Sequence, residues 1–285
     1  MTIPYPHIPP EIFRVGPFAL RWYGVMYVVG YVVGYRIARA RIGRGLVAMT
    51  VAALDTFVGY LVVGMLLGAR VMYAVAYEPG HYLHDPLEFF RVWRGGLSFH
   101  GAVIGMAVAC LVFARVHRIS FWQLADTLAL AGTPGLFFGR LGNFINGELY
   151  GRPTHVPWAM VFPTDPLGLP RHPSQLYEAV AEGIVLFLVL RALERRAVTR
   201  GWYHPGLLAG AFLVGYGVIR FALEFTRQPD AQLGLVLGPF SMGQMLSAGT
   251  VVIGVLLLVI VFAGRHRAPD YQASVDAPGA VPPAS

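Results

Sequence analysis

Seven long apolar runs constrain this chain more than any other feature of its sequence. They cover residues 17–36, 50–76, 97–115, 121–139, 174–191, 205–226 and 240–263. A helix needs about 20 mostly apolar residues to cross the hydrocarbon core of a bilayer. Charged residues make up 13% of the chain, against about 25% in an average soluble domain. The sequence therefore predicts an all-α polytopic membrane protein with seven transmembrane helices.

The basic residues indicate the orientation of these helices. The Lys+Arg total is 22, and every one of these residues is Arg. Alternate connections and the segment after the last run collect Arg36, Arg39, Arg41, Arg44, Arg115, Arg118, Arg191, Arg195, Arg196, Arg200, Arg265 and Arg267. An excess of Arg in short loops marks the cytoplasmic side. We therefore expect the amino terminus outside and the carboxyl terminus in the cytoplasm. We interpret the net charge of +7 as a sign of membrane orientation rather than of nucleic-acid binding.

Two further features bound the organisation of the chain. Residues 265–285 are small and rich in Pro, which predicts a disordered cytoplasmic tail after a membrane domain of residues 1–264. The single cysteine, Cys110, lies in an apolar run, so we expect a buried, inert thiol and no disulfide framework.

One group of unusual polar residues lies in GRLGNFINGELYG, residues 139–151. Arg140 ends the fourth apolar run, and Asn143, Asn146 and Glu148 follow it among glycines. A helix end with Arg140 reaching the membrane interface is the structural alternative. A turn alone, however, does not need two amides and an ion pair. We therefore interpret this segment as part of a functional site.

A second polar group lies on the sixth run, in GYGVIRFALEFTRQPD. Tyr216, Arg220 and Glu224 are four residues apart and Arg227 follows three residues later, so all four share one helical stripe. A structural Arg220–Glu224 pair is the alternative. Ionised side chains within membrane helices nevertheless usually face a bundle interior or a wet cavity and mark a site.

Other polar positions allow more than one interpretation. His100, in GGLSFHG, is either a histidine satisfied within the core or a base, since histidine accepts protons near neutral pH. In RHPSQLYEA, helix capping accounts for Ser174 and Glu178 but not for Gln175 and Tyr177. The first run begins with Trp22, typical of an interfacial belt, and Tyr23, whose role stays open. The sequence suggests no partner for the intramembrane acids Asp55, Asp126 and Glu182.

Arg140 and Arg220 are expected to face one cavity on the outer side of the membrane. The planar guanidinium group forms bidentate bonds to phosphate, and a phospholipid headgroup is the abundant phosphate there. An anion or lipid transporter with an Arg-lined cavity is an alternative, but no polar stripe continues toward the cytoplasmic ends, and no internal repeat supports inverted halves. A structural lipid-binding membrane protein is a third possibility.

Five segments carry a resemblance to a known family: RWYGVMY, GGLSFHG, GRLGNFINGELYG, RHPSQLYEA and YGVIRFALEFTRQPD. Together they resemble, in the same order, sequence blocks of the bacterial prolipoprotein diacylglyceryl transferases, and the resemblance covers most of residues 16–263. It implies an enzyme of the bacterial inner membrane that transfers the diacylglyceryl group of phosphatidylglycerol to the lipobox cysteine of a prolipoprotein. The products would be a thioether and glycerol 1-phosphate, and no metal or organic cofactor is implied.

The resemblance also implies functional positions and small extracytoplasmic elements. The elements would lie at about 1–16, 78–95 and 150–172. The implied functional residues, with Asn146 added from the loop composition, are Tyr23, His100, Arg140, Asn143, Asn146, Glu148, Gly151, Tyr216, Arg220, Glu224 and Arg227. We expect Arg140 and Arg220 to hold phosphate, with Glu148 and Glu224 orienting them. Tyr23 or Tyr216 would align the base or the lipid, and His100 is the first candidate for general base.

Overall fold

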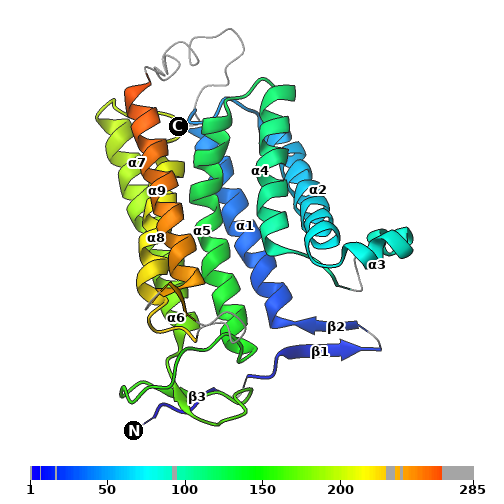
Figure 1. Ribbon diagram of the computed structural model, residues 1–285. Coiled ribbons are helices and arrows are strands. Elements are labelled where there is room, and N and C mark those ends of the chain that lie inside the picture. The colour runs from blue at the N-terminus through cyan, green and yellow to red at the C-terminus, as the bar shows by residue number, and fades with distance from the viewer. Residues whose placement is uncertain are drawn as a thin grey trace. The chain divides into compact units, whose positions relative to one another are not determined.

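The computed structural model describes residues 2–6, 8–16, 18–91, 95–228, 235–237 and 240–264, without the side chains of Leu83 and of 235–237. The tail predicted at 265–285 lies outside these residues. Each of the seven apolar runs contains helix within the described residues. The helices are α1 (Trp22–Gly43), α2 (Val51–Ala76), α3 (Pro79–His84), α4 (Phe99–Val116), α5 (Phe121–Ile145), α6 (Ser174–Glu178), α7 (Leu186–Thr199), α8 (Leu207–Leu223) and α9 (Met242–Ala263) (Figure 1).

Three of these helices, α2, α4 and α9, are long and apolar enough to cross a membrane, and α8 is a shorter apolar helix. The protein is therefore a mostly helical chain with membrane character. A 3₁₀ turn covers Pro86–Phe90, and a π-helical turn, Ala179–Val185, joins α6 to α7. The seven crossings predicted from the sequence stay a prediction.

The helix boundaries differ most from the apolar runs at three places. Helix α1 begins at Trp22 because Phe18–Arg21 forms a strand, whereas the first run starts at residue 17. Helix α5 continues past residue 139 to Ile145, through Pro134. The helical path of α6, the π turn and α7 continues past residue 191 to Thr199. Hydropathy locates only the apolar residues of a helix. The helix itself ends where its backbone hydrogen bonds end, which can be beyond the apolar residues.

The strands form three small antiparallel pairs between the described helices. Strand β1 (Glu11–Val15) pairs with β2 (Phe18–Arg21), β3 (Met160–Val161) with β4 (Pro170–Arg171), and β5 (Leu235–Leu237) with β6 (Phe240–Ser241). The register aligns Val15 with Phe18 and Met160 with Arg171. These pairs lie before α1, between α5 and α6, and before α9.

Contacts divide the chain into two units, Met1–Ala38 with Asp126–Pro278, and Arg39–Ala125 with Gly279–Ser285. In the second unit α2 and α4 lie side by side (Figure 1). A Cβ atom at Gly68 would lie 2.7 Å from the Gly105 Cα, so glycine is what permits this close approach. The hydroxyl groups of Thr50 and Ser98 cap the first turns of α2 and α4.

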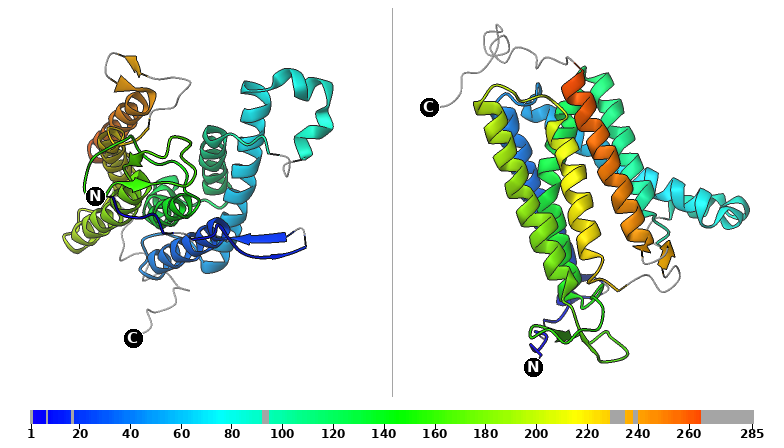
Figure 2. Two further views of the ribbon diagram at one scale, coloured as in Figure 1. Left: turned by 90° about the horizontal axis from the view of Figure 1, so that it is seen from below. Right: turned by 60° about the vertical axis from the view of Figure 1, so that its left-hand side comes forward.

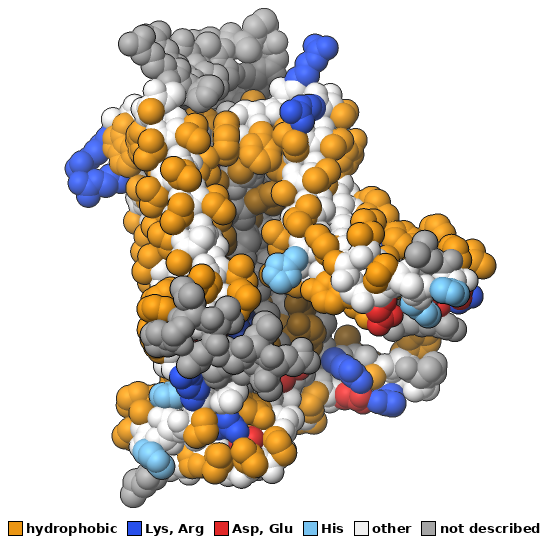
Figure 3. All heavy atoms as spheres, in the orientation of Figure 1, with side chains coloured by type: hydrophobic (Ala, Val, Ile, Leu, Met, Phe, Trp, Pro, Cys, Tyr) orange, Lys and Arg blue, Asp and Glu red, His pale blue; other side chains and the backbone are white. Residues whose placement is uncertain are grey.

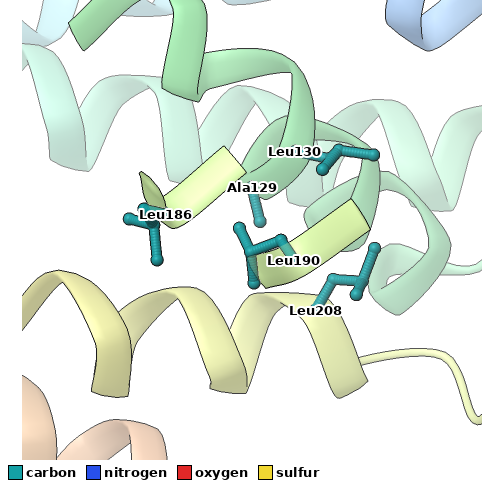
Figure 4. Packing of buried hydrophobic residues seen from close by; sticks show 5 residues of the cluster. All are labelled: Ala129, Leu130, Leu186, Leu190 and Leu208. Atoms are coloured by element: carbon teal, nitrogen blue, oxygen red, sulfur yellow. The ribbon is translucent and has the colours of Figure 1, made fainter. Parts of the chain in front are cut away.

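The first unit is built around α5, α7, α8 and α9. Ala129 and Leu130 of α5, Leu186 and Leu190 of α7, and Leu208 of α8 form a buried cluster (Figure 4). Helices α8 and α9 run side by side in both views of Figure 2, and Gly210 faces Leu258 there. Lipid tails are as apolar as Leu, so close packing rather than removal from water holds such helices together.

Asp126 has a structural role that the sequence did not reveal. Its carboxylate accepts hydrogen bonds from the backbone N–H groups of Gly206 at 3.0 Å and Ala209 at 2.8 Å, and from the Tyr203 hydroxyl at 2.6 Å. These are donors at the amino-terminal end of α8, where a negative charge is favourable. Asp126 is therefore a cap that fixes the start of α8 against α5.

The outward faces of the helices are apolar. On α9, Val252, Ile253, Val255 and Leu256 are exposed, and Figure 3 shows hydrophobic side chains covering the helical surfaces that face the viewer. A soluble protein rarely exposes such continuous apolar surface. This distribution fits a protein whose helices are surrounded by lipid.

Candidate active site

The end of α5 and the loop after it gather the amides and the carboxylate predicted to lie together. The side-chain amides of Asn143 and Asn146 donate to Oε1 of Glu148 at 2.9 and 3.1 Å. Gly147, between them and Glu148 in sequence, has φ +68°, a left-handed conformation that favours glycine. The chain therefore turns tightly enough for one carboxylate oxygen to accept both amides.

Helix α6 anchors this loop through side chains interpreted from sequence as a helix cap. The Ser174 hydroxyl donates to the Leu149 carbonyl at 3.0 Å, and the Gln175 amide donates to the Glu148 carbonyl at 2.7 Å. The residue preceding the helix is Pro173, and it makes no side-chain cap bond. The capping interpretation of Ser174 is therefore wrong, and its hydroxyl instead fixes the backbone of the site loop.

Gly151 joins the loop to the segment that follows α8. Its N–H donates to the His172 carbonyl at 2.8 Å, and it forms an isolated bridge with Arg227. A Cβ atom at Gly151 would lie 2.7 Å from the Cβ of His172. The Arg152 Nε also donates to the Arg227 carbonyl at 2.8 Å. The absence of a side chain at Gly151 therefore lets the loop, the segment before α6 and the segment after α8 meet.

Arg140 and Arg220 converge on one carboxylate. Glu178, on α6, has Oε2 2.8 Å from Arg140 Nε and Oε1 2.7 Å from Arg220 Nη1. The three side chains come from α5, α6 and α8. The Glu178 side chain is 2% exposed and that of Arg140 is 19% exposed. A ligand can therefore reach the arginines more readily than the carboxylate that joins them.

Two more acidic residues and one more arginine complete the charged cluster. Glu182, on the π turn, lies 3.9 Å from both Arg140 Nε and Arg220 Nη1. Glu224 lies 3.2 Å from Arg220 Nη2 and 4.0 Å from Arg227 Nη1, so the stripe predicted on the sixth run does bring its ionised groups together. The Ser241 hydroxyl donates to Glu224 Oε1 at 3.0 Å.

The expected role of Glu148 is wrong in one respect. We expected it to orient the guanidinium groups, but its carboxylate accepts the two loop amides, and Glu178 contacts both arginines instead. Sequence reasoning missed Glu178 and Glu182 as members of the cluster. Two acids four residues apart on an apolar helix would have been the signal, because that spacing places them on one face.

The two tyrosines predicted for the site lie in different surroundings. The Tyr23 hydroxyl is 3.0 Å from that of Tyr27, and a Cβ atom at Gly142 would lie 2.7 Å from the Tyr23 ring. Tyr23 therefore packs directly against the segment that carries Asn143. Tyr216 is partly buried, packs against the cluster of Figure 4, and stacks on Phe212 with ring centroids 5.7 Å apart.

His100 belongs to the second unit, so its proximity to the Arg pair stays a prediction. It is exposed in the first turn of α4. The segment before it is held by buried Arg70, which donates to the carbonyls of Phe89 at 2.8 Å and Gly96 at 3.1 Å. A guanidinium with several carbonyl acceptors fixes a loop without a carboxylate. Arg70 thereby orders the backbone that leads into His100.

A buried ion pair braces the segment between α5 and α6. Arg171 Nε and Nη2 donate to the two carboxylate oxygens of Asp165 at 2.6 and 2.9 Å, a bidentate geometry. These bonds lower the pKa of the Asp165 carboxyl below its usual value. Next to it, burial lowers the pKa of the His172 imidazole. Across the part of the chain that the structure describes, no group of three or more His, Cys, Asp or Glu residues is placed to hold a metal ion.

Comparisons with known proteins agree over nearly the whole chain. The family model described as prolipoprotein diacylglyceryl transferase matches residues 10–260. A phosphatidylglycerol–prolipoprotein diacylglyceryl transferase of Bordetella bronchiseptica is 49% identical over 256 residues, which are 88% of this chain and 94% of the relative. Proteins of the same name from Geobacter sulfurreducens and Pasteurella multocida are 48% and 45% identical, over 90% and 92% of this chain and 96% of each relative. The matched region includes both arginines and His100.

Proposed function

Because the chain belongs to the prolipoprotein diacylglyceryl transferase family, we propose that it transfers the diacylglyceryl group of phosphatidylglycerol to the lipobox cysteine of prolipoproteins. The cysteine sulfur forms a bond to the glycerol carbon of the lipid, and the bond from that carbon to the phosphate oxygen breaks. Glycerol 1-phosphate leaves, and the thiol proton passes to a base. The meeting of Arg140 and Arg220 at Glu178 is the structural observation that carries this proposal.

The arginine pair suits the leaving group of this reaction. The displaced phosphate gains negative charge as the carbon–oxygen bond breaks. Guanidinium groups fixed in advance stabilise such charge without having to reorganise, and their fork matches two phosphate oxygens. Arg140 and Arg220 therefore bind the lipid phosphate, while Asn143 and Asn146 shape the loop or bind the headgroup glycerol.

The thiol requires a base. The thiolate is the attacking form of cysteine, and an unperturbed thiol has a pKa of about 8.5, so most of it is protonated at neutral pH. His100 is the proposed acceptor of the proton. Tyr23 and Tyr216 are proposed to align the lipid or the base, and Glu224, Arg227 and Gly151 to hold the arginine side of the site in place.

The proposal includes the arrangement in the membrane. Seven helices cross the bacterial inner membrane, the amino terminus is outside and the carboxyl terminus is cytoplasmic, consistent with Arg in alternate connections. Residues 1–264 form the catalytic domain, and segments 1–16, 78–95 and 150–172 lie on the outer side. The lipid substrate and the lipidated product would then exchange with the outer leaflet. Cysteine labelling from each side of the membrane tests this topology.

Reconstitution tests the activity directly. The purified chain is incubated in phosphatidylglycerol vesicles with a peptide that carries a lipobox cysteine. We expect a thioether-linked diacylglyceryl peptide and an equal amount of glycerol 1-phosphate. A transporter would move anions or lipid without forming product, and a structural lipid-binding protein would do neither. A lack of both products from folded protein contradicts the proposal.

A further inference from the structure

Two acids, Glu178 and Glu182, face the same two nitrogen atoms of the arginine pair. Glu178 directs one oxygen at Arg140 Nε and the other at Arg220 Nη1, at 2.8 and 2.7 Å. Glu182 directs its two oxygens at the same two nitrogens, each at 3.9 Å. Each nitrogen therefore faces two carboxylates, one in contact and one more than an ångström farther away.

The surroundings of these two acids differ. The side chain of Glu182 is 0% exposed, and within the described residues neither of its carboxylate oxygens has a hydrogen-bond partner. Glu178, in contrast, accepts a hydrogen bond from Arg220. Burying a carboxylate without hydrogen bonds costs free energy. An apolar side chain at the same position would avoid that cost. The geometry therefore points to a role for Glu182 other than holding a guanidinium in place.

The backbone places Glu182 there through an irregular turn. Glu182 lies on the π turn Ala179–Val185, and such turns frequently occur at functional sites. Gly183 faces α5 so closely that a Cβ atom on it would lie 2.8 Å from the Phe137 Cα. Arg140 is one helical turn farther along α5. The close approach at Gly183 therefore brings the acid-bearing turn against the arginine-bearing turn.

We propose that Glu178 and Glu182 are positioning residues with separate tasks. Glu178 fixes the mutual orientation of Arg140 and Arg220. Glu182 limits the positive charge that these two arginines present to a phosphate. This inference rests on the proposed function, because it concerns the phosphate site of that reaction. Glu178 acts through contact and geometry. Glu182 acts through charge, at a distance that leaves the guanidinium groups bound to Glu178.

A limit on positive charge has a chemical reason in this reaction. The substrate phosphodiester carries one negative charge, whereas the released glycerol 1-phosphate is a phosphomonoester that carries more. Two arginines without counter-charge would bind the product more tightly than the substrate and delay its release. Three acids, Glu178, Glu182 and Glu224, face the three arginines Arg140, Arg220 and Arg227. Negative charge on these acids offsets the positive charge that a phosphate meets at the arginines.

Four substitutions separate position from charge. Glu178→Gln and Glu182→Gln remove a charge at nearly constant size, whereas Glu178→Asp and Glu182→Asp keep the charge on a shorter side chain. Calorimetry on the detergent-purified full chain measures the dissociation constant for glycerol 1-phosphate and for inorganic phosphate. The reconstituted assay gives kcat and KM for each variant, and thermal unfolding shows whether it is folded.

We expect Glu182→Gln to bind glycerol 1-phosphate about tenfold more tightly, since an opposing charge is removed from a buried site, and to keep at least about a tenth of the turnover. Glu182→Asp should bind it with wild-type affinity. Glu178→Gln and Glu178→Asp should both lose about 100-fold in kcat, because a displacement of about 1 Å in a catalytic geometry has that effect. Glu178→Asp should nevertheless bind inorganic phosphate as the wild type does.

Glu194→Gln is the matched control. Glu194 is another fully buried acid of the same helical path, paired with Arg191 outside the cluster, so its loss should lower the unfolding temperature and leave kcat and phosphate binding unchanged. Wild-type kcat in Glu178→Gln overturns the positioning task, and unchanged phosphate affinity in Glu182→Gln overturns the charge task. If wild-type protein forms no thioether while Glu182→Gln still binds phosphate more tightly, the proposed function fails and the charge task stands.

Discussion

The side-chain amide of Asn143, in the last turn of α5, donates a hydrogen bond to Oε1 of Glu148 at 2.9 Å, across a turn that Gly147 makes possible. Asn146 donates to the same oxygen. One carboxylate thus fixes the orientation of two amides whose carbonyl oxygens and remaining protons can face a headgroup. The loop is ordered by its own side chains before any lipid is bound.

Replacing Glu148 by Gln tests this ordering. Hydrogen bonds to a charged acceptor contribute about 1.5–3 kcal/mol each, and Gln keeps the size but loses the charge. We expect kcat/KM to fall by about tenfold or more in the reconstituted transfer assay. The unfolding temperature should fall as well, but modestly, because Glu148 is exposed to solvent. Glu78→Gln, on an exposed residue before α3, is the control. Full activity in Glu148→Gln would show that the amides are oriented without it.

Arg140→Lys tests the planar fork. Lysine keeps the positive charge but offers one compact ammonium group in place of a guanidinium that meets Glu178 and can still bind phosphate. We expect a loss of about 100-fold in kcat with a smaller change in phosphate affinity. Arg200→Lys, at the exposed end of α7, should transfer lipid as the wild type does. Equal turnover of the two variants contradicts a role for the fork.

His100→Gln tests the base. General base catalysis contributes about 10²–10⁴-fold, so we expect most of the transfer rate to disappear while phosphatidylglycerol binding is kept. Rescue gives a second measurement: if thiol deprotonation is the lost step, a higher pH should recover part of the rate by supplying thiolate. His84→Gln, in exposed α3, controls for loss of an imidazole. A normal rate in His100→Gln rules out the assignment.

The sequence could predict those features that are determined within a single helix. The apolar runs gave the helices, and the stripe Tyr216, Arg220, Glu224 and Arg227 gave an ion pair, because spacing on a single helix determines both. It could not predict what depends on other elements. Phe18–Arg21 is apolar enough to extend the first run, but pairing with β1 makes it a strand.

Glu178 illustrates the same limit at the site. Its place in the first turns of a helix is equally typical of a favourable charge near the helix start. Only the arrangement of α5 and α8 around α6 shows that it contacts Arg140 and, 42 residues away, Arg220. Asp126 is a parallel case, since its partners lie at the start of α8, about 80 residues farther along the chain.

Gly151→Ala tests the junction of the loop with α8. The added Cβ atom would lie 2.7 Å from the His172 Cβ and 2.9 Å from its carbonyl oxygen, too close for either to remain in place. We expect a lower unfolding temperature and a loss of most transfer activity. Gly132→Ala adds the same atom within α5, where nothing lies within 4 Å, and should be neutral or slightly stabilising. Equal behaviour of the two variants would contradict the close junction.

His172 predicts how stability depends on pH. Burial lowers the pKa of its imidazole in the folded protein, whereas the unfolded chain takes up that proton near pH 6.5. Above about pH 6.5 both states are neutral at this residue, so its contribution to stability is constant there. As the pH falls below that value, the unfolded state binds the proton first, and stability decreases until the folded-state pKa is reached.

The measurement is the unfolding temperature of the detergent-purified protein between about pH 8 and pH 5, a range that spans the pKa of unfolded His. We expect a decrease toward the acidic end that is smaller in His172→Gln, because Gln cannot titrate. The His172 ring lies 3.2 Å from the Tyr177 hydroxyl, and Gln can keep a hydrogen bond there. His81→Gln, on an exposed residue of α3, should decrease as steeply as the wild type. An unchanged slope in His172→Gln means that other groups cause the decrease.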